Sequence, residues 1–192
     1  GAYLVGSIPF SLLVARARGV DLRTVGSGSI GASNVWRNCG FGPFLLAMSL
    51  DVLKGFLPTL MAVQVAQLPP AAVVLVGMAA ILGHTFSLYL GFKGGKAVAT
   101  STGVLLASAP VLIAVGLAVW MSAFAASRMA SVASLAGITV VTIMATIMFA
   151  LGQLPLAYAG LVWLAACLIV YLHRSNIQRL RAGTESRFQK LW

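Results

Sequence analysis

Long apolar segments separated by short polar loops form the dominant pattern of this chain. A helix needs about 20 residues, at a rise of about 1.5 Å per residue, to cross about 30 Å of hydrocarbon. Four of the segments clearly reach that length, whereas the first is shorter and its start stays open. We therefore predict an all-α protein, a polytopic membrane helical bundle that forms one domain over residues 1–192. The apolar segments cover residues 3–15, 43–66, 71–90, 97–126, 132–151 and 155–172.

The segment at residues 97–126 is too long for one span and short for two. Pro110 is the expected break if this segment crosses twice. Lys and Arg in short loops stay on the cytoplasmic side of a membrane, and only two crossings place Arg128 on the same face as the basic tail. We therefore predict seven transmembrane helices, with the amino end outside and the carboxyl end in the cytoplasm. The tail cations are Arg174, Arg179, Arg181, Arg187 and Lys190.

Composition supports this membrane assignment. Of the 192 residues, 60% are hydrophobic and only 8% are charged, which excludes a soluble domain of this size. Apolar segments recur to the end of the chain, so a secretory signal peptide is the wrong interpretation. The 13 Lys and Arg residues, against three acidic ones, fit an anionic membrane surface or phosphorylated substrates. Because these cations are divided among membrane loops, we expect membrane lipid as a partner and no nucleic acid.

The polar residues gather at one side of the predicted bundle. The outer loops at residues 67–70, near Pro110 and at 152–155 are short and uncharged. The inner loops hold nearly all the glycine clusters, hydroxyls, amides and cations. An active site built from these groups therefore faces the cytoplasm.

The first polar cluster, residues 26–37, contains a formal G-x-G-x-x-G match. That fingerprint binds dinucleotides only between a strand and a helix of a parallel-sheet unit, and these apolar segments allow no such unit. Glycine backbone N–H groups and hydroxyls still suit an oxyanion, and Arg37 can bind a phosphate with two N–H groups. Ser27, Gly28 and Asn34 are the candidate phosphate-binding residues here, with Arg37 as a candidate catalytic residue. The alternative is a flexible glycine turn.

The second cluster joins His84 to the loop at residues 91–96. It lacks the spacing and the hydroxyl of a phosphate loop for ATP. Gly94, Gly95 and Lys96 at a helix start nevertheless offer backbone N–H groups, a positive dipole end and an ammonium, which together predict an anion site. The alternative, a topological anchor, explains Lys93 better than Lys96. His84 is either a substrate contact or proton carrier, or a structural histidine within reach of this loop.

Asp51 and Lys54 are spaced i and i+3 on one predicted helix. An internal ion pair is the better interpretation of this spacing, although Lys54 stays a candidate for phosphate binding.

The third cluster, residues 173–185, has the period of a short helix on the membrane surface. His173 and Asn176 share one face of that helix and can face the site. Arg179, Arg181 and Arg187 are most simply anchors for lipid headgroups. Ser131, where a span returns to the inner side, completes the predicted ring of polar groups.

Several of these motifs occur together in the order and spacing of a known family. They are Gly6-Ser7-Ile8-Pro9 and the segments 26–37, 51–55, 83–84, 91–100 and 173–185. In these motifs the chain resembles the PlsY family, bacterial integral-membrane acyltransferases that use acyl phosphate as donor and glycerol 3-phosphate as acceptor. The chain departs from the usual family pattern at Ser29, Ser33, Ser87 and Ala97, none of which removes a charge.

The resemblance implies both the activity and the residues that carry it. The product is lysophosphatidic acid, in the first step of phospholipid synthesis at the bacterial inner membrane, with no metal and no cofactor. By resemblance, Ser27, Arg37 and Lys96 hold phosphate, and Gly94 and Gly95 supply backbone donors. The remaining candidates are His84, Ser131, His173 and Asn176.

The reaction implied is attack of the sn-1 hydroxyl on the activated carbonyl, without an acyl-enzyme. A donor phosphate oxygen accepts the proton, with His84 as the rival base. The main alternative function is a transporter for a phosphorylated solute. Such a protein needs ionisable or broken-helix positions near the bilayer midplane, whereas this chain gathers its polar groups at one end of the spans.

Overall fold

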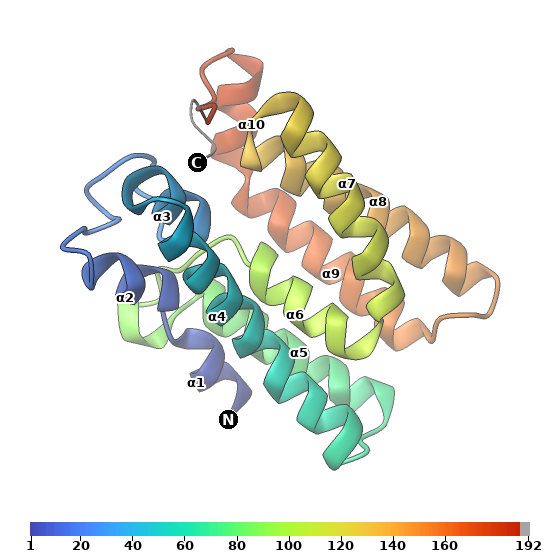
Figure 1. Cartoon of the computed structure of the whole chain (residues 1–192). Helices are drawn as coiled ribbons and strands as arrows, with labels where there is room; N and C mark the ends of the chain where they lie inside the picture. Colours follow the sequence, from blue (N-terminus) through green and yellow to red (C-terminus); the bar gives the residue numbers. More distant parts are fainter. Residues whose placement is uncertain (189–192) are drawn as a thin grey trace.

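The computed structural model describes residues 1–188, and over that range the chain is helical with no strand (Figure 1). Lys190 of the predicted basic tail lies outside the described residues. Two short turns, Met61–Val65 and Leu88–Leu90, extend helices α4 and α5. The ten α-helices within this range are α1 (Ala2–Ser7), α2 (Phe10–Arg16), α3 (Ala32–Cys39), α4 (Phe41–Leu60), α5 (Pro70–Thr85), α6 (Val98–Ser108), α7 (Pro110–Ser127), α8 (Ala130–Ala150), α9 (Leu156–Leu172) and α10 (Arg174–Arg181).

Four segments are long and apolar enough to cross a membrane: Phe41–Val65, Pro70–Leu90, Pro110–Ser127 and Ala130–Ala150. α9 joins them as a fifth when it is taken together with α10, from which it is separated by a 55° bend. Two shorter apolar segments lie at residues 2–16 and 98–108. The all-helical membrane architecture is therefore confirmed.

Prolines mark several of the helix boundaries, although Pro58 lies inside α4. Pro110 opens α7 directly after Ala109, whose φ of −151° and ψ of 65° end α6. The predicted break of the segment 97–126 is thus confirmed, and Figure 1 shows the chain reversing there. Pro9 likewise separates α1 from α2, so the first apolar segment is two short helices rather than the single one that was predicted.

Glycines allow the closest helix contacts. A side chain at Gly55 would clash with the carbonyl of Thr100, and one at Gly103 would clash with the carbonyl of Val52, where α4 packs on α6. Gly6 of α1 meets the backbone of α5 in the same way. Because lipid tails are as apolar as leucine, helices in a membrane associate through such close packing.

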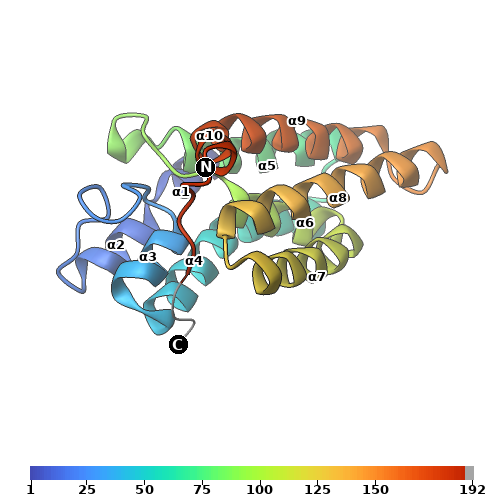
Figure 2. The ribbon, with the colours of Figure 1, turned by 90° about the horizontal axis from the view of Figure 1, so that it is seen from above.

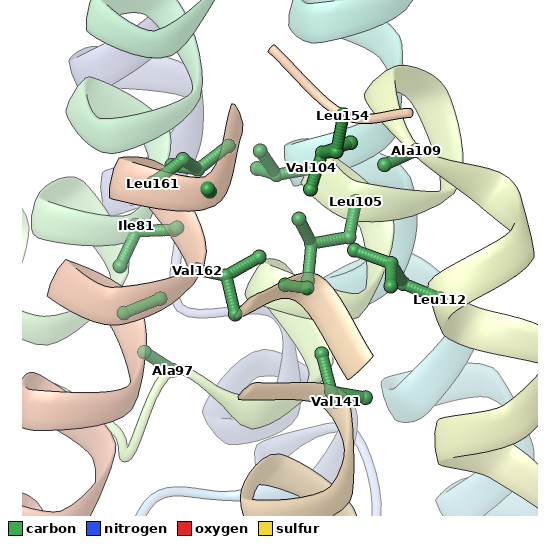
Figure 3. Packing of buried hydrophobic residues seen from close by; sticks show 13 residues of the cluster. Ile81, Ala97, Val104, Leu105, Ala109, Leu112, Val141, Leu154, Leu161 and Val162 are labelled. Atoms are coloured by element: carbon green, nitrogen blue, oxygen red, sulfur yellow. The ribbon is translucent and has the colours of Figure 1, made fainter. Parts of the chain in front are cut away.

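The largest apolar cluster lies where α5, α6, α7, α8 and α9 meet (Figure 3). Val104, Leu112, Leu161 and Val162 are fully buried in it, and Ile81 is almost so. This core fixes α6, and with it the loop that precedes α6 and carries the second polar cluster.

Candidate active site

A cavity of about 530 Å³ opens between the helices and has two chemically different ends. Its polar end is lined by side chains from all three predicted polar clusters. Its apolar end runs between α4, α6, α7 and α8. The polar lining includes Ser27, Asn34, Arg37, His84, Lys96, Ser131, His173, Asn176, Arg179 and Glu185, and the apolar lining includes Leu45, Met48, Leu105, Ile113, Leu117, Trp120 and Ile138.

Asn34 holds the glycine-rich loop in shape. Its amide nitrogen lies 2.9 to 3.1 Å from the carbonyls of Leu22, Val25 and Ser29, and its oxygen accepts the N–H of Ser27 at 3.3 Å. The amide is thus occupied by the loop itself, and the structure gives Asn34 a positioning role rather than a free phosphate donor. Ser27 keeps its place at the edge of the cavity.

Gly28 serves the turn of this loop. Its φ of +67° is readily adopted only by glycine, and its N–H donates to the Val25 carbonyl at 3.0 Å. Gly28 is not among the described residues that line the cavity. Gly28, predicted to bind phosphate, therefore shapes the turn of the loop.

Arg37, in the last turn of α3, lines the cavity. Its terminal nitrogen donates to the carbonyl of Ser186 at 3.2 Å, whereas its buried Nε has no partner within residues 1–188. Burial lowers the pKa of the guanidinium, which the charge of Glu185 opposes, but an arginine stays protonated at physiological pH. A partly buried guanidinium with an unused donor suits an anionic ligand.

His84 and the glycine loop contact each other as the sequence predicted. α5 ends at Thr85, and the N–H of Gly95 donates to the His84 carbonyl at 3.0 Å. A side chain at Gly95 would clash with the His84 ring, and one at Gly94 would clash with the His84 carbonyl. The expectation of a free N–H on both glycines is wrong for Gly95, because that N–H closes the loop onto α5.

Lys96 connects this loop to the third cluster. Its ammonium donates to the side-chain oxygen of Asn176 on α10. Burial lowers the pKa of Lys96 to about 8, although the nearby Glu185 raises it. A phosphate bound beside this ammonium would raise the pKa again, so the position favours an anion.

Glu185 organises the polar end, a role that the sequence analysis missed. Its carboxylate accepts hydrogen bonds from Ser131 and Asn176, each at 2.6 Å, and from Arg179 at 2.7 Å. Burial raises the pKa of this carboxyl, but the three hydrogen bonds together hold it below the ordinary value. One carboxylate therefore fixes Ser131, Asn176 and Arg179. The predicted role of Arg179 as a simple lipid anchor is replaced by its ion pair with Glu185.

His173 lies at the bend between α9 and α10 and is buried. Its Nδ1 lies 2.8 Å from the Ile169 carbonyl, so Nδ1 donates and Nε2 keeps a lone pair. His173 and Asn176 both line the cavity, as their spacing predicted.

Lys54 is turned away from the cavity. Its ammonium pairs with Asp51 at 2.7 Å and donates to the Ile8 carbonyl at 2.8 Å, at the break between α1 and α2. The predicted internal ion pair is confirmed, and the structure does not support Lys54 as a phosphate ligand, since it does not line the described cavity. Asp51 does line it, accepting from Ser11 at 2.6 Å and lying 3.8 Å from His84.

The missed residues lacked a readable pattern. Glu185 is the last residue of the third cluster, nine residues after Asn176, and its partner Ser131 is 54 residues away. The one available signal was the low number of acidic residues. In a chain with only three of them, an acidic residue within a basic tail is expected to pair with a cation.

Comparisons with known proteins agree with this geometry. The sequence model of the glycerol-3-phosphate acyltransferase family matches residues 1–183. The chain is 61% identical over 191 residues to a glycerol-3-phosphate acyltransferase of Roseiflexus sp. (strain RS-1), covering 100% of this chain and 94% of that protein. It is 41% identical over 187 residues to one from Aquifex aeolicus (strain VF5), covering 97% and 95%.

Solved structures give the same result. The chain superimposes with a TM-score of 0.91 and 40% identity on a crystal structure of PlsY, an integral membrane glycerol 3-phosphate acyltransferase, in its glycerol 3-phosphate form. The match covers 99% of this chain and 93% of that one. The lysophosphatidic acid form of the same enzyme gives a TM-score of 0.88 at 38% identity. The resemblance carried by the polar motifs is confirmed.

Proposed function

Because this chain belongs to the glycerol-3-phosphate acyltransferase family, an integral membrane enzyme family, we propose a specific reaction for it. The protein transfers an acyl chain from acyl phosphate to the sn-1 hydroxyl of glycerol 3-phosphate. The products are lysophosphatidic acid and inorganic phosphate.

One observation carries this proposal: a single cavity joins a cation-lined polar end to an apolar end between four helices. Acyl phosphate has the same two parts, a charged head and a hydrocarbon chain. The acyl chain fits the apolar end of the cavity, between α4, α6, α7 and α8, while the head reaches Arg37 and Lys96. The bilayer supplies a direct route for the chain.

The phosphate groups of the two substrates are assigned to the cationic residues. Arg37 and Lys96 supply charge, and Ser27 supplies a further donor. Gly94 and Gly95 are not among the described residues that line the cavity. Ser131, His173 and Asn176 complete the polar wall. Charge from these groups lowers the barrier because both the leaving phosphate and the carbonyl oxygen gain negative charge in the transition state.

Transfer proceeds directly between the bound substrates. The sn-1 hydroxyl oxygen forms a bond to the carbonyl carbon, the bond between that carbon and the phosphate oxygen breaks, and the hydroxyl proton leaves on a phosphate oxygen. Positioning of the two substrates supplies much of the rate, since the mixed anhydride is already activated.

His84 is better suited to position the loop than to accept this proton. Its ring lies against Gly95, and its Nδ1 faces Asp51. Replacement by glutamine, which keeps hydrogen bonding but cannot accept a proton at neutral pH, separates the two roles. Activity within about tenfold of the unsubstituted protein supports positioning, and a loss of about 10³-fold or more, beyond the usual range for a single donor, supports general base catalysis.

Seven spans are proposed for the bacterial plasma membrane, with the amino end outside and the active site and carboxyl end in the cytoplasm. From α4 to α9 the helices alternate in direction along the chain (Figure 1), and the two short apolar segments serve as the remaining spans. Cysteines introduced singly at Gln153 and Arg181, in a variant whose native Cys39 and Cys167 are replaced by serine, test this arrangement. Impermeant thiol reagents should label position 153 in intact cells and position 181 in inside-out vesicles. The reverse pattern would contradict this topology.

The activity is tested with purified protein in lipid and radiolabelled glycerol 3-phosphate. Acyl phosphate, acyl-CoA and acyl carrier protein are compared as donors of the same chain. Labelled lysophosphatidic acid from acyl phosphate alone supports the proposal. Equal product from acyl-CoA would reject the donor assignment, and no product from any donor in folded protein would direct attention to solute flux.

A further inference from the structure

Residues 184–188, here called the C-terminal strap, cross the open side of the polar end. The strap leaves α10 and runs toward α3 and α4, as the red segment in Figure 2 shows. Glu185 and Ser186 of the strap line the cavity. The strap lies just beyond the residues that the family model matches, which end at 183.

Phe188 is the main contact of the strap with both sides of the cavity. Only 4% of this residue is exposed. Its ring centroid lies 4.8 Å from that of Trp36 on α3 and 5.3 Å, edge on, from that of Phe124 on α7. The same ring packs with Ala130 and Ala133 of α8. One side chain therefore bridges the α3 side and the α7–α8 side.

Hydrogen bonds fix the strap at both ends. At one end Glu185 is held by Ser131, Asn176 and Arg179, as described above. At the other end the N–H of Phe188 donates at 2.9 Å to the carbonyl of Arg128, in the turn between α7 and α8. The position of the Phe188 ring is thus set by the backbone as well as by packing.

Arg37 receives two contacts from this strap. Its guanidinium carbon lies 4.4 Å from the centroid of the Phe188 ring, a distance at which the charge is attracted to the ring face. Its terminal nitrogen donates to the Ser186 carbonyl. An unrestrained arginine would lose rotamer entropy on binding a phosphate, and these contacts remove part of that loss in advance.

We propose that Phe188 is a positioning residue for Arg37, and that the strap acts as a clasp that holds the two sides of the polar end together. The ring face sets the plane of the guanidinium toward the cavity. The clasp also covers the polar end beside Arg37, which limits the access of water to the activated donor.

Phe188→Leu is the informative variant, because leucine keeps the apolar packing and removes the ring face. The inference rests on the proposed function, so acyl transfer by the unsubstituted protein is established first. We expect Phe188→Leu to raise the KM of at least one of the two phosphate substrates about fivefold. The same change in an Arg37→Lys background, where no planar guanidinium remains at position 37, should raise that KM less than about twofold.

Phe149→Leu is the matched control, since Phe149 of α8 packs edge on against Trp163 of α9, at 5.9 Å, and does not line the described cavity. It should leave both KM values unchanged. An equal effect of Phe188→Leu in both backgrounds, or none in either, overturns the proposal. If Phe188→Leu does not fold, Phe188→Met is measured in the same two backgrounds and judged by the same outcomes.

Discussion

The two ends of the cavity are built on different rules. The polar end brings together side chains far apart in sequence, and each is fixed by a particular partner, as Asn176 is by Lys96 and Glu185. The apolar end is lined by aliphatic and aromatic side chains of four helices that share only their lack of charge. Catalysis is therefore expected to depend on residue identity at the polar end. The preferred length of the acyl chain is expected to depend on residue volume at the apolar end.

The sharpest test of this difference compares two lysines of one loop. Lys96 lies in the cavity and Lys93 is exposed. Loss of one preorganised charged donor to a developing anion costs about 10² to 10³-fold in rate. We expect Lys96→Ala to lose about 10³-fold in kcat/KM and Lys93→Ala to lose less than about twofold, in the radiolabel assay. Equal effects would mean that the loop acts only through its net charge.

Replacing Glu185 should show that the polar end depends on the residue that holds its side chains in place, as well as on its cations. Glu185→Ala leaves Ser131, Asn176 and Arg179 without their shared acceptor, so we expect about a 10²-fold loss of activity together with a lower melting temperature. Glu185→Gln keeps the shape and should recover part of both. A full activity in Glu185→Ala would contradict the organising role.

The apolar end should instead respond to volume. Ile113 of α7 lines the cavity, and tryptophan at this position would fill part of the space for the acyl chain. We expect Ile113→Trp to lower kcat/KM about tenfold for a long-chain acyl phosphate and to leave a short-chain donor nearly unaffected. Leu75→Trp, on an exposed face of α5, is the control. An equal loss of kcat/KM for every acyl-chain length would mean that the acyl chain does not bind beside Ile113.

The pH dependence gives the smallest expected effect. The pKa of Lys96 is lowered to about 8, so its ammonium is present below pH 8 and is lost as the pH rises above it. KM for the phosphate substrate bound there should rise severalfold between pH 7 and pH 9. Lys96→Arg keeps its charge over this range, and its KM should stay flat. An unchanged slope in Lys96→Arg would assign the titration to another group.

The sequence predicted the parts of this protein that depend on local rules. Spans follow from apolar length, the break at Pro110 from the missing N–H of proline, and the contact between His84 and Gly95 from the position of His84 at the end of its helix. These features need only neighbouring residues.

Features that depend on distant partners were not predicted. The ion pair of Lys54 with Asp51 was predicted from their i and i+3 spacing, whereas the contact of Lys54 with the Ile8 carbonyl, at the break between α1 and α2, was not. Glu185 and Phe188 act through partners on other helices. Their roles follow from how α3, α7, α8 and α10 meet, and no spacing within the chain encodes that meeting.

The central claim is that both substrates occupy one cavity and that the acyl group passes between them without an acyl-enzyme. The most direct measurement is a single-turnover experiment with acyl phosphate labelled in its acyl chain and no glycerol 3-phosphate. We expect no label on the denatured protein, and transfer of the label to lysophosphatidic acid when glycerol 3-phosphate is added. Covalent label on the protein that chases into product would contradict it.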